Sequence, residues 1–408
     1  MSPKNLLCLA LLTTIVGLTP AFVWAQPSSR VRVDADLNGK DPFAIRAGAS
    51  QRPALTPATP TQNRNSTPRT DETAASGAPN DVLYVRDAKA PLACVVTTIS
   101  GSGGLTALVQ NEPKTFSLGS IERVELSVSD EFRRGVDAFE SGKRTGAKTE
   151  FERALELFKT ARQTSERRLE KEWATAKIVE TYSALGRDDE AASEFFLLCR
   201  LDPYSPYLAS APLRWVNQTT LKRGSSLDSK NVAEATAAQW LALKDNPSGT
   251  FNPTGRLLAA SILLNSSQHS KEAVAAMQAL VALEPPDDAD EDAVETCRAI
   301  SLLATEQLWR AAVLRKPTER EVAHWSKTIE ATPGELTLGP EYLVALGQKS
   351  LGQDDLAART FLRVAALASD RFALAEAATR QAADAYDRLG QADVAQKIRA
   401  DLTRRFSK

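Results

Sequence analysis

The side chains that most often carry out chemistry are few in this chain and lie far apart. Its 408 residues include only two histidines, His269 and His324. A zinc-binding HExxH helix needs two histidines four residues apart, and a Ser-His-Asp or Cys-His site would depend here on one isolated histidine. We expect His269 in a solvated turn between helices and His324 on a packed or exposed helix face. The sequence therefore predicts a protein that is not an enzyme.

Three alternating carboxylates, Asp288, Asp290 and Asp292, have the spacing of the first ligands of a calcium loop. The rest of that motif does not follow. Ala293 stands where the sharp turn needs glycine, and Ala299 stands where a bidentate glutamate should close the loop. An acidic cluster at the start of a helix, favoured by the helix dipole, explains the run better. We predict no metal and no cofactor.

Three cysteines, Cys94, Cys199 and Cys297, are widely spaced in the chain beyond residue 25. Such spacing is not that of a disulfide framework, so each is expected to be a small buried apolar side chain, with one long-range disulfide as the alternative.

The densely charged run 162–172 has mixed signs and an Arg168–Glu172 pair at helical spacing, which indicates a solvated helix face.

The amino-terminal 25 residues have the pattern of a secretory signal peptide. Lys4 precedes an apolar run, and the helix-breaking Pro20 follows it. Cleavage is expected after Ala25, with small residues one and three positions before the cut. An uncleaved anchor is the alternative, and no later stretch is apolar for long enough to span a membrane. We therefore predict export to the periplasm or the extracellular space, with a bacterial cell envelope as the expected setting.

Residues 26–80 contain seven prolines and many Ser, Thr, Asn and Gln residues. Such a segment buries too little apolar surface to offset its ordering entropy, so we predict a disordered linker.

The net charge of the whole chain is close to zero, because 50 Lys and Arg side chains nearly balance 51 Asp and Glu side chains. A chain with a net charge near zero has no overall field to attract nucleic acid, and no nucleic-acid partner is predicted.

Short β-branched runs in residues 81–126 predict five strands, at 82–85, 92–99, 105–109, 114–118 and 121–126. Turn residues separate them, including the glycine run near 101–104. Five strands in so short a stretch predict a small antiparallel β-barrel. The pattern weakly resembles SH3-like and Sm-like barrels, which would make this part a binding or docking domain.

From residue 127 to the carboxyl terminus the apolar residues recur with helical spacing. In residues 172–205, Trp173 and Tyr182 on a first helix lead to a turn at Gly186, then to Ala191 and Phe195 on a second helix, with Pro203 closing the unit. This order resembles the tetratricopeptide repeat, a helix-turn-helix unit of about 34 residues. The resemblance implies a mainly α protein whose helix pairs stack into a superhelix.

Four other segments, 128–161, 254–287, 338–371 and 376–408, fit the same frame less fully. The five frames share a small-residue column: Ala147, Ala191, Ala273, Ala357 and Ala395. A coarser self-similarity relates Trp240, Gly255 and Ala273 to Trp325, Gly339 and Ala357. The whole of 127–408 is expected to form one domain, and a second boundary near 206–230, which contains two prolines and a polar stretch, is the alternative.

Tetratricopeptide-like arrays bind an extended or helical peptide in a concave groove lined by the first helix of each pair. The resemblance thereby implies a protein or peptide partner here, although the Lys and Asn pattern that some members use to hold a terminal carboxylate is missing. Burial between helices is the alternative for each groove position. The candidate groove residues are Phe132, Val136, Trp173, Glu180, Leu258, Ile262, Tyr342, Leu346, Arg380 and Asp384.

Three functions follow from this reading. The first is an exported scaffold or adaptor that mediates protein–protein interaction in the cell envelope without catalysis. The second is a structural, self-associating envelope component, whose sheet edges or superhelix ends pair with other copies. The third, a carbohydrate-binding or enzymatic envelope protein, would need converging carboxylates or an aromatic platform.

Overall fold

A computed structural model describes residues 81–86, 88, 90–99, 104–117, 120–201, 207–216, 227–243, 252–285 and 291–406. The predicted signal peptide and linker, residues 1–80, lie outside the described residues. So do Asp288 and Asp290 of the acidic run, while the helix expected after them begins at Glu291.

All five predicted strands are present, and they form one antiparallel sheet in the order β4-β3-β2-β1-β5. Alternate residues on one face, such as Leu83, Leu105 and Ile121, are fully buried. The strands are β1 (Asp81–Val85), β2 (Leu92–Ile99), β3 (Gly104–Val109), β4 (Glu112–Ser117) and β5 (Ile121–Glu125).

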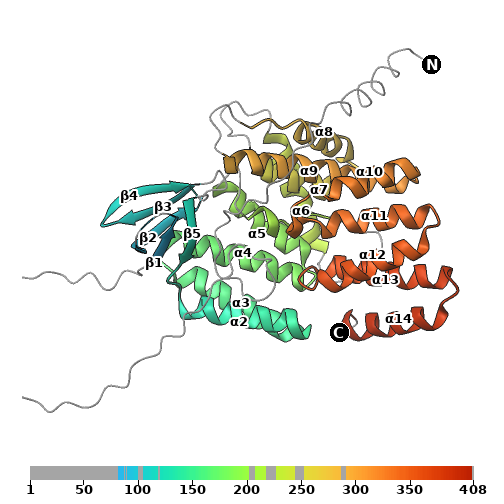
Figure 1. The fold of residues 1–408 in the computed structure, drawn as a ribbon, viewed down its shortest axis with the longest axis horizontal. Helices are drawn as coiled ribbons and strands as arrows, with labels where there is room; N and C mark the ends of the chain where they lie inside the picture. Colours follow the sequence, from blue (N-terminus) through green and yellow to red (C-terminus); the bar gives the residue numbers. More distant parts are fainter. Residues whose placement is uncertain are drawn as a thin grey trace, which may run out of the picture.

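The prediction of a closed β-barrel is wrong, because β4 and β5 lie at opposite edges and do not pair. Closure would require both edge strands to face an enclosed interior with apolar side chains. The sequence of β4, Glu-Pro-Lys-Thr-Phe-Ser, supplies one large apolar side chain, Phe116, and the strand is exposed over most of its length. The sheet therefore stays open, as Figure 1 shows.

Thirteen α-helices follow the sheet within the described residues, and none of them is both long and apolar enough to cross a membrane. They are α2 (Asp130–Thr145), α3 (Lys148–Thr164), α4 (Arg168–Ala184), α5 (Asp188–Leu201), α6 (Leu227–Ala242), α7 (Pro253–Leu263), α8 (Ser270–Val281), α9 (Glu291–Leu314), α10 (Glu319–Ile329), α11 (Leu338–Ser350), α12 (Asp354–Leu367), α13 (Phe372–Arg388) and α14 (Ala392–Phe406).

Each of the five predicted frames coincides with a pair of packed helices: α2/α3, α4/α5, α7/α8, α11/α12 and α13/α14. Four of the pairs turn at a glycine with positive φ, namely Gly146 (69°), Gly186 (72°), Gly352 (77°) and Gly390 (72°). Glycine adopts this left-handed conformation without the steric cost that a Cβ atom imposes. The Arg187 amide then donates to the Tyr182 carbonyl at 2.8 Å, which ends α4 and starts the turn into α5.

The small-residue column is present in four of the five pairs. Ala191, Ala273, Ala357 and Ala395 are each the fourth residue of a second helix, and each is fully buried. A methyl group at this position lets the second helix approach the first closely. The column thereby sets the spacing within these pairs.

The first pair departs from that column, because Ala147 precedes α3 and is only half-buried. Here the small residues lie on α2 instead. A Cβ atom added to Gly142 would lie 2.9 Å from the ring of Phe151, and one added to Gly135 would lie 2.7 Å from Phe158. The aromatic rings of α3 therefore occupy the space that these two glycines leave.

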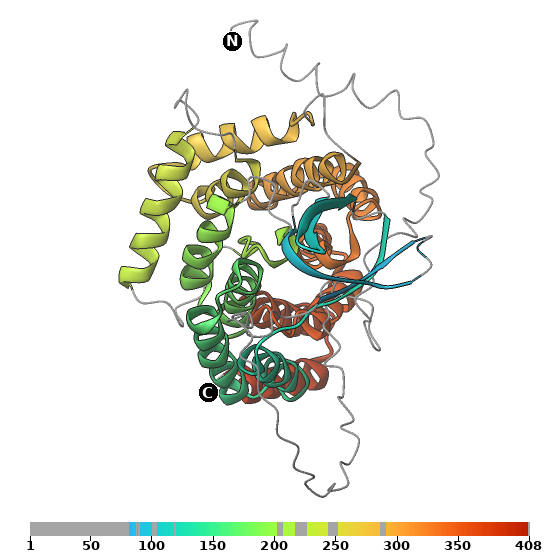
Figure 2. The ribbon, with the colours of Figure 1, turned by 90° about the vertical axis from the view of Figure 1, so that its left-hand side faces the viewer.

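The helix pairs follow a curved path that returns toward its start. Figure 2 shows the helices progressing from green through yellow to red, with the red ones beside the green. Contacts between α7 and α9, α9 and α11, and α11 and α13 continue to a contact between α13 and α4. At that last contact the ring of Phe372 packs against Gly186. Residues far apart in the sequence thus enclose a common interior.

We predict that Gly135→Ala destabilises the protein by about 1–3 kcal/mol, because the added methyl group would overlap the buried Phe158 ring. Helix propensity alone would give the opposite sign, a gain of up to about 1 kcal/mol. Urea denaturation followed by circular dichroism measures the change. Arg134→Ala, at the exposed neighbouring position, serves as the control and should change stability by less than about 0.5 kcal/mol. A stabilised Gly135→Ala variant would contradict the close packing of α2 on α3.

Candidate functional site: the interior of the helical array

The segment 207–216 runs through the interior enclosed by the helices (Figure 2). Its residues Tyr207, Leu208, Arg214 and Trp215 are each less than one-tenth exposed. The sequence suggested a break in the helical array near this point only as the alternative to one continuous domain. In the structure the segment forms part of the core.

Two hydrogen bonds fix the first part of the segment to distant parts of the chain. The Ser210 hydroxyl donates to the Glu180 carboxylate of α4 at 2.7 Å, and the Arg371 guanidinium, just before α13, donates to the Ala209 carbonyl at 3.1 Å. Leu208–Ser210 form a 3-10 helix, which is held through the Ser210 hydroxyl and the Ala209 carbonyl.

Arg214 fixes the second part of the segment. Its backbone amide donates to the Ser261 hydroxyl of α7 at 2.8 Å, and its guanidinium forms an ion pair with Asp189 of α5. Both members of this ion pair are buried. Burial raises the pKa of the neighbouring Asp188, and the positive charge of Arg214 opposes that rise.

Trp215 lies against Gly339 of α11, so closely that a Cβ atom at Gly339 would overlap the indole ring. The coarse self-similarity in the sequence paired Gly339 with Gly255, and Gly255 of α7 is covered by Trp240. The corresponding Trp325 does not cover Gly339, because it stacks on the Trp309 ring with centroids 5.2 Å apart. Trp215 of the segment 207–216 (the central segment) supplies the aromatic ring at Gly339 instead.

A polar cluster surrounds Ser261 of α7, which contacts Arg214 of the segment. The Ser261 hydroxyl donates to Gln307 Oε1 at 3.0 Å, and Arg310 Nη1 donates both to that oxygen at 2.8 Å and to the Ser261 carbonyl at 2.9 Å. Gln307 and Arg310 belong to α9 and are buried. Burial lowers the pKa of Arg310 to about 9, and the nearby positive charge of Arg214 contributes to the decrease. The guanidinium still carries its charge at neutral pH.

Glu306, also on α9, is fully buried and accepts a hydrogen bond of 2.6 Å from the Thr332 hydroxyl. Burial raises the pKa of Glu306 to about 8, and the hydrogen bond from Thr332 opposes the rise. At neutral pH the side chain is therefore mainly protonated and uncharged.

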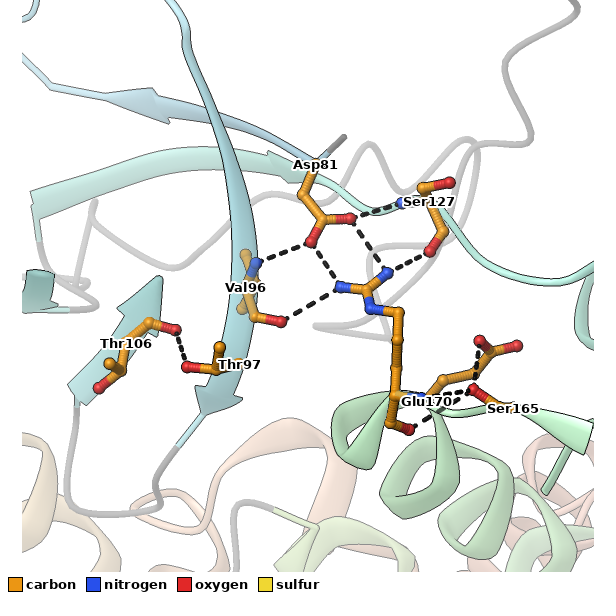
Figure 3. Close-up of polar contacts among 8 residues, drawn as sticks. Asp81, Val96, Thr97, Thr106, Ser127, Ser165 and Glu170 are labelled. Carbon is orange, nitrogen blue, oxygen red and sulfur yellow. Dashed lines mark hydrogen bonds and ion pairs between the residues drawn. The ribbon is translucent and has the colours of Figure 1, made fainter. Parts of the chain in front are cut away.

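A second buried polar cluster joins the sheet to the helices (Figure 3). Arg167, between α3 and α4, forms an ion pair with Asp81 at the start of β1 and donates to the carbonyls of Ser127 and Val96. The backbone amides of Ser127 and Val96 each donate to Asp81 at 2.8 Å. Burial raises the pKa of Asp81, while these two amides and the Arg167 charge oppose the rise.

Glu170 extends this cluster to the start of α2. It accepts a hydrogen bond of 2.9 Å from the Ser129 amide and another of 2.9 Å from the Ser165 hydroxyl. The prediction that the charged run 162–172 is a solvated helix face is therefore wrong for Arg167 and Glu170. The predicted Arg168–Glu172 pair is present, with 2.7 Å between Nε and Oε1. No periodicity in the sequence marks Arg167, because its partner Asp81 lies in another part of the chain.

Most of the candidate groove residues lie inside the helix packing. Phe132 contacts the rings of Phe158 and Trp173, with centroids 5.5 and 6.2 Å away, and Tyr342 contacts the Phe361 ring at 5.6 Å. The five buried candidates are Phe132, Trp173, Leu258, Ile262 and Tyr342, while Val136 and Leu346 are half-buried. Burial of Tyr342 raises its pKa well above the ordinary value.

The three charged candidates are at least partly accessible. Glu180 binds Ser210 of the central segment and forms an ion pair with Lys177 at 2.8 Å. Arg380 pairs with Glu376 at 2.8 Å, and Asp384 lies 3.6 Å from Lys349 of α11. The side chains of Arg380 and Asp384 are 49% and 47% exposed, so this part of α13 can be reached from solvent.

The other residues considered for chemistry are scattered over the structure. His269 is half-buried in the turn before α8, as predicted, and His324 is exposed on α10. Cys94, Cys199 and Cys297 are buried as predicted, and burial raises the pKa of Cys94 to about 11. Within the described residues, no group of three or more His, Cys, Asp or Glu side chains has an arrangement that could hold a metal ion.

We predict strong coupling between Trp215 and Gly339. Trp215→Ala should cost about 3–5 kcal/mol through the cavity that it leaves, and Gly339→Ala should also destabilise, because its methyl group would overlap the indole ring. In the double variant the alanine at 339 should cost far less, with a coupling of about 0.5–3 kcal/mol. Urea denaturation of the four proteins measures this cycle. Additive effects would contradict the position of Trp215 against α11.

Glu306→Gln should remove a loss of stability that the wild type shows between pH 4.5 and 8. The folded-state pKa of about 8 exceeds the ordinary value of 4.5, so this residue's contribution to stability is complete below pH 4.5 and is lost as the pH rises through 8. The wild type should lose up to about 1.4 kcal/mol per pH unit within that window, and the variant should not. Urea denaturation at pH 5, 7 and 9 tests this. Glu295→Gln, at an exposed position of α9, is the control and should follow the wild type.

Compared with known proteins, the chain matches no protein-family model, no curated protein and no solved structure.

Proposed function

We propose that the helical part, residues 127–408, is a tetratricopeptide-like superhelical array that acts as a scaffold for protein–protein interaction. Five helix pairs at the predicted frames, four of them turning at a left-handed glycine, support this assignment. So do the buried alanines that begin four of the second helices. The curved path in Figure 2 gives such an array a continuous inner face.

The observation that carries the functional proposal is the segment 207–216. Glu180 of α4 binds its Ser210 hydroxyl, and Asp189 of α5 pairs with its Arg214. Arg371 binds its Ala209 carbonyl, and α11 receives its indole ring. The inner face thereby offers a polypeptide segment hydrogen-bonding groups for side chains and backbone and an apolar recess for a side chain. We propose that a partner polypeptide uses the remainder of this face.

Of the ten candidate groove residues, those with accessible or half-buried side chains define the proposed contact: Val136, Glu180, Leu346, Arg380 and Asp384. The buried candidates serve packing in this proposal. Substitution of Trp173 or Tyr342 by alanine would cost about 3–5 kcal/mol of stability and would not isolate binding. Arg380 and Asp384, the two charged candidates on α13, are better residues with which to test partner binding.

The proposed setting is the cell envelope outside the cytoplasm, and it rests on the signal-like pattern of the first 25 residues. In this proposal the open sheet is a docking or spacing element held to the scaffold by Arg167. No catalysis is proposed.

Affinity capture from the exported fraction of the native cells, with the full chain as bait, tests the scaffold. A bait with Arg380→Ala and Asp384→Ala should lose a specific protein that the wild-type bait retains, because these side chains are exposed on the proposed inner face. The matched control bait carries Asp355→Ala and Arg359→Ala, which remove a pair of the same charges and spacing on α12. The control should retain the partner.

Loss of the partner from both variant baits, or from neither, would contradict recognition by this face. Circular dichroism must show unchanged helix content in each bait. Light scattering at two protein concentrations distinguishes the structural alternative, because a self-associating component increases in mass with concentration whereas a scaffold for another protein does not.

A further inference from the structure

Three buried hydrogen-bond donors in the interior have no acceptor among the described residues. They are Arg214 Nε, Arg310 Nε and Gln307 Nε2. The residues that carry them are 7%, 2% and 0% exposed. Buried donors are nearly always paired in folded proteins, because an unpaired one loses its hydrogen bonds to water without replacement. Three in one place indicate a missing acceptor.

The three side chains belong to one cluster centred on Ser261. The Ser261 hydroxyl accepts from the Arg214 amide at 2.8 Å and donates to Gln307 Oε1 at 3.0 Å. Arg310 donates to the same Gln307 oxygen at 2.8 Å and to the Ser261 carbonyl at 2.9 Å. Arg214 of the segment 207–216 and Gln307 and Arg310 of α9 are therefore joined through Ser261 of α7.

The two guanidinium groups of this cluster differ in their partners. Arg214 is paired with Asp189 and lies near Asp188. In the described part of the chain, no carboxylate lies within ion-pair distance of Arg310, whose pKa is lowered by burial and by the positive charge of Arg214. A buried, uncompensated guanidinium is unfavourable unless an anion or a dense set of hydrogen bonds accompanies it. Arg310 is thus left without an anionic partner.

We infer that Arg214, Gln307 and Arg310 form an interior binding site for one small monovalent anion, of the size of a halide or formate ion. Such an ion would accept hydrogen bonds from these donors and give Arg310 an anionic partner. A water molecule could accept some of the same hydrogen bonds but would supply no negative charge. Sulfate is larger and divalent, so its burial in this interior would cost more.

This inference is independent of the proposed scaffold function. The anion would connect the segment 207–216, through Arg214, to α9, through Gln307 and Arg310. Occupancy of the site would then stabilise the segment in the interior.

Thermal unfolding of the full chain tests the site, with chloride exchanged for the bulky monovalent anion gluconate at constant ionic strength. The wild type should unfold at increasing temperature as chloride rises, by about 2 °C for each tenfold increase above the dissociation constant. Constant ionic strength removes general screening as an explanation. Replacing chloride by sulfate should give no comparable increase.

Two variants remove the requirement for an anion in different ways. Arg310→Met deletes the positive charge that has no anionic partner, and Gln307→Glu supplies an internal carboxylate that can still accept from Arg310 and Ser261. Both should lose the chloride response, and Gln307→Glu should unfold at a higher temperature than the wild type in gluconate. The second variant preserves the side-chain shape, so the test stands even where the first fails to fold. Arg359→Met, at an exposed position, should retain the wild-type response.

Crystals grown in bromide give the direct readout, because an anomalous peak should lie among the three donors in the wild type and disappear in Gln307→Glu. A water molecule at this position with no bromide peak would overturn the inference. A chloride response shared by all four proteins would overturn it as well. A bromide peak without any chloride response in unfolding would indicate an adventitious ion only and would also decide against the site.

Discussion

A curved stack of helix pairs leaves an inner face that must be covered, and the rest of this structure depends on how it is covered. The path of the helices brings α13 back to α4, so residues from both ends of the array enclose one interior. Polar backbone and apolar side chains there must find partners away from water. The segment 207–216 supplies them, with Trp215 against Gly339 and Arg214 paired with Asp189. The array is thereby held in its curved form by a piece of its own chain.

The open sheet is attached by a different kind of contact. Within one helix pair, packing is mainly apolar, as between Phe151 and Gly142. Arg167 has a planar set of donors that fits Asp81 and two carbonyls in one geometry. Because each of these groups is buried or nearly so, a small displacement would leave a charge unpaired. The junction therefore fixes the orientation of the sheet on α4.

Local patterns in the sequence predicted the local structure well. The five strands and the five helix pairs lie where alternation, helical spacing and turn glycines such as Gly186 placed them. Interactions between distant residues were not predictable in this way. Nothing near Arg167 in the sequence indicates Asp81 as its partner. The prolines at 206 and 212 are typical of a linker, and no local pattern indicates that helices enclose the segment 207–216. The same limit explains the groove: Phe132 and Tyr342 occupy the expected helices, but only the curvature of the whole array decides that they are buried.

A bound internal segment changes what recognition by the inner face would require. A partner that displaced 207–216 would have to replace the Arg214–Asp189 ion pair and refill the recess at Gly339. Its apparent affinity would be the intrinsic affinity multiplied by the small fraction of molecules in which the segment is released. A partner that binds beside the segment meets no such cost. Arg380 and Asp384 are accessible on α13 while the segment stays in place. Recognition at these side chains is therefore compatible with the closed interior, and it requires no opening of the array.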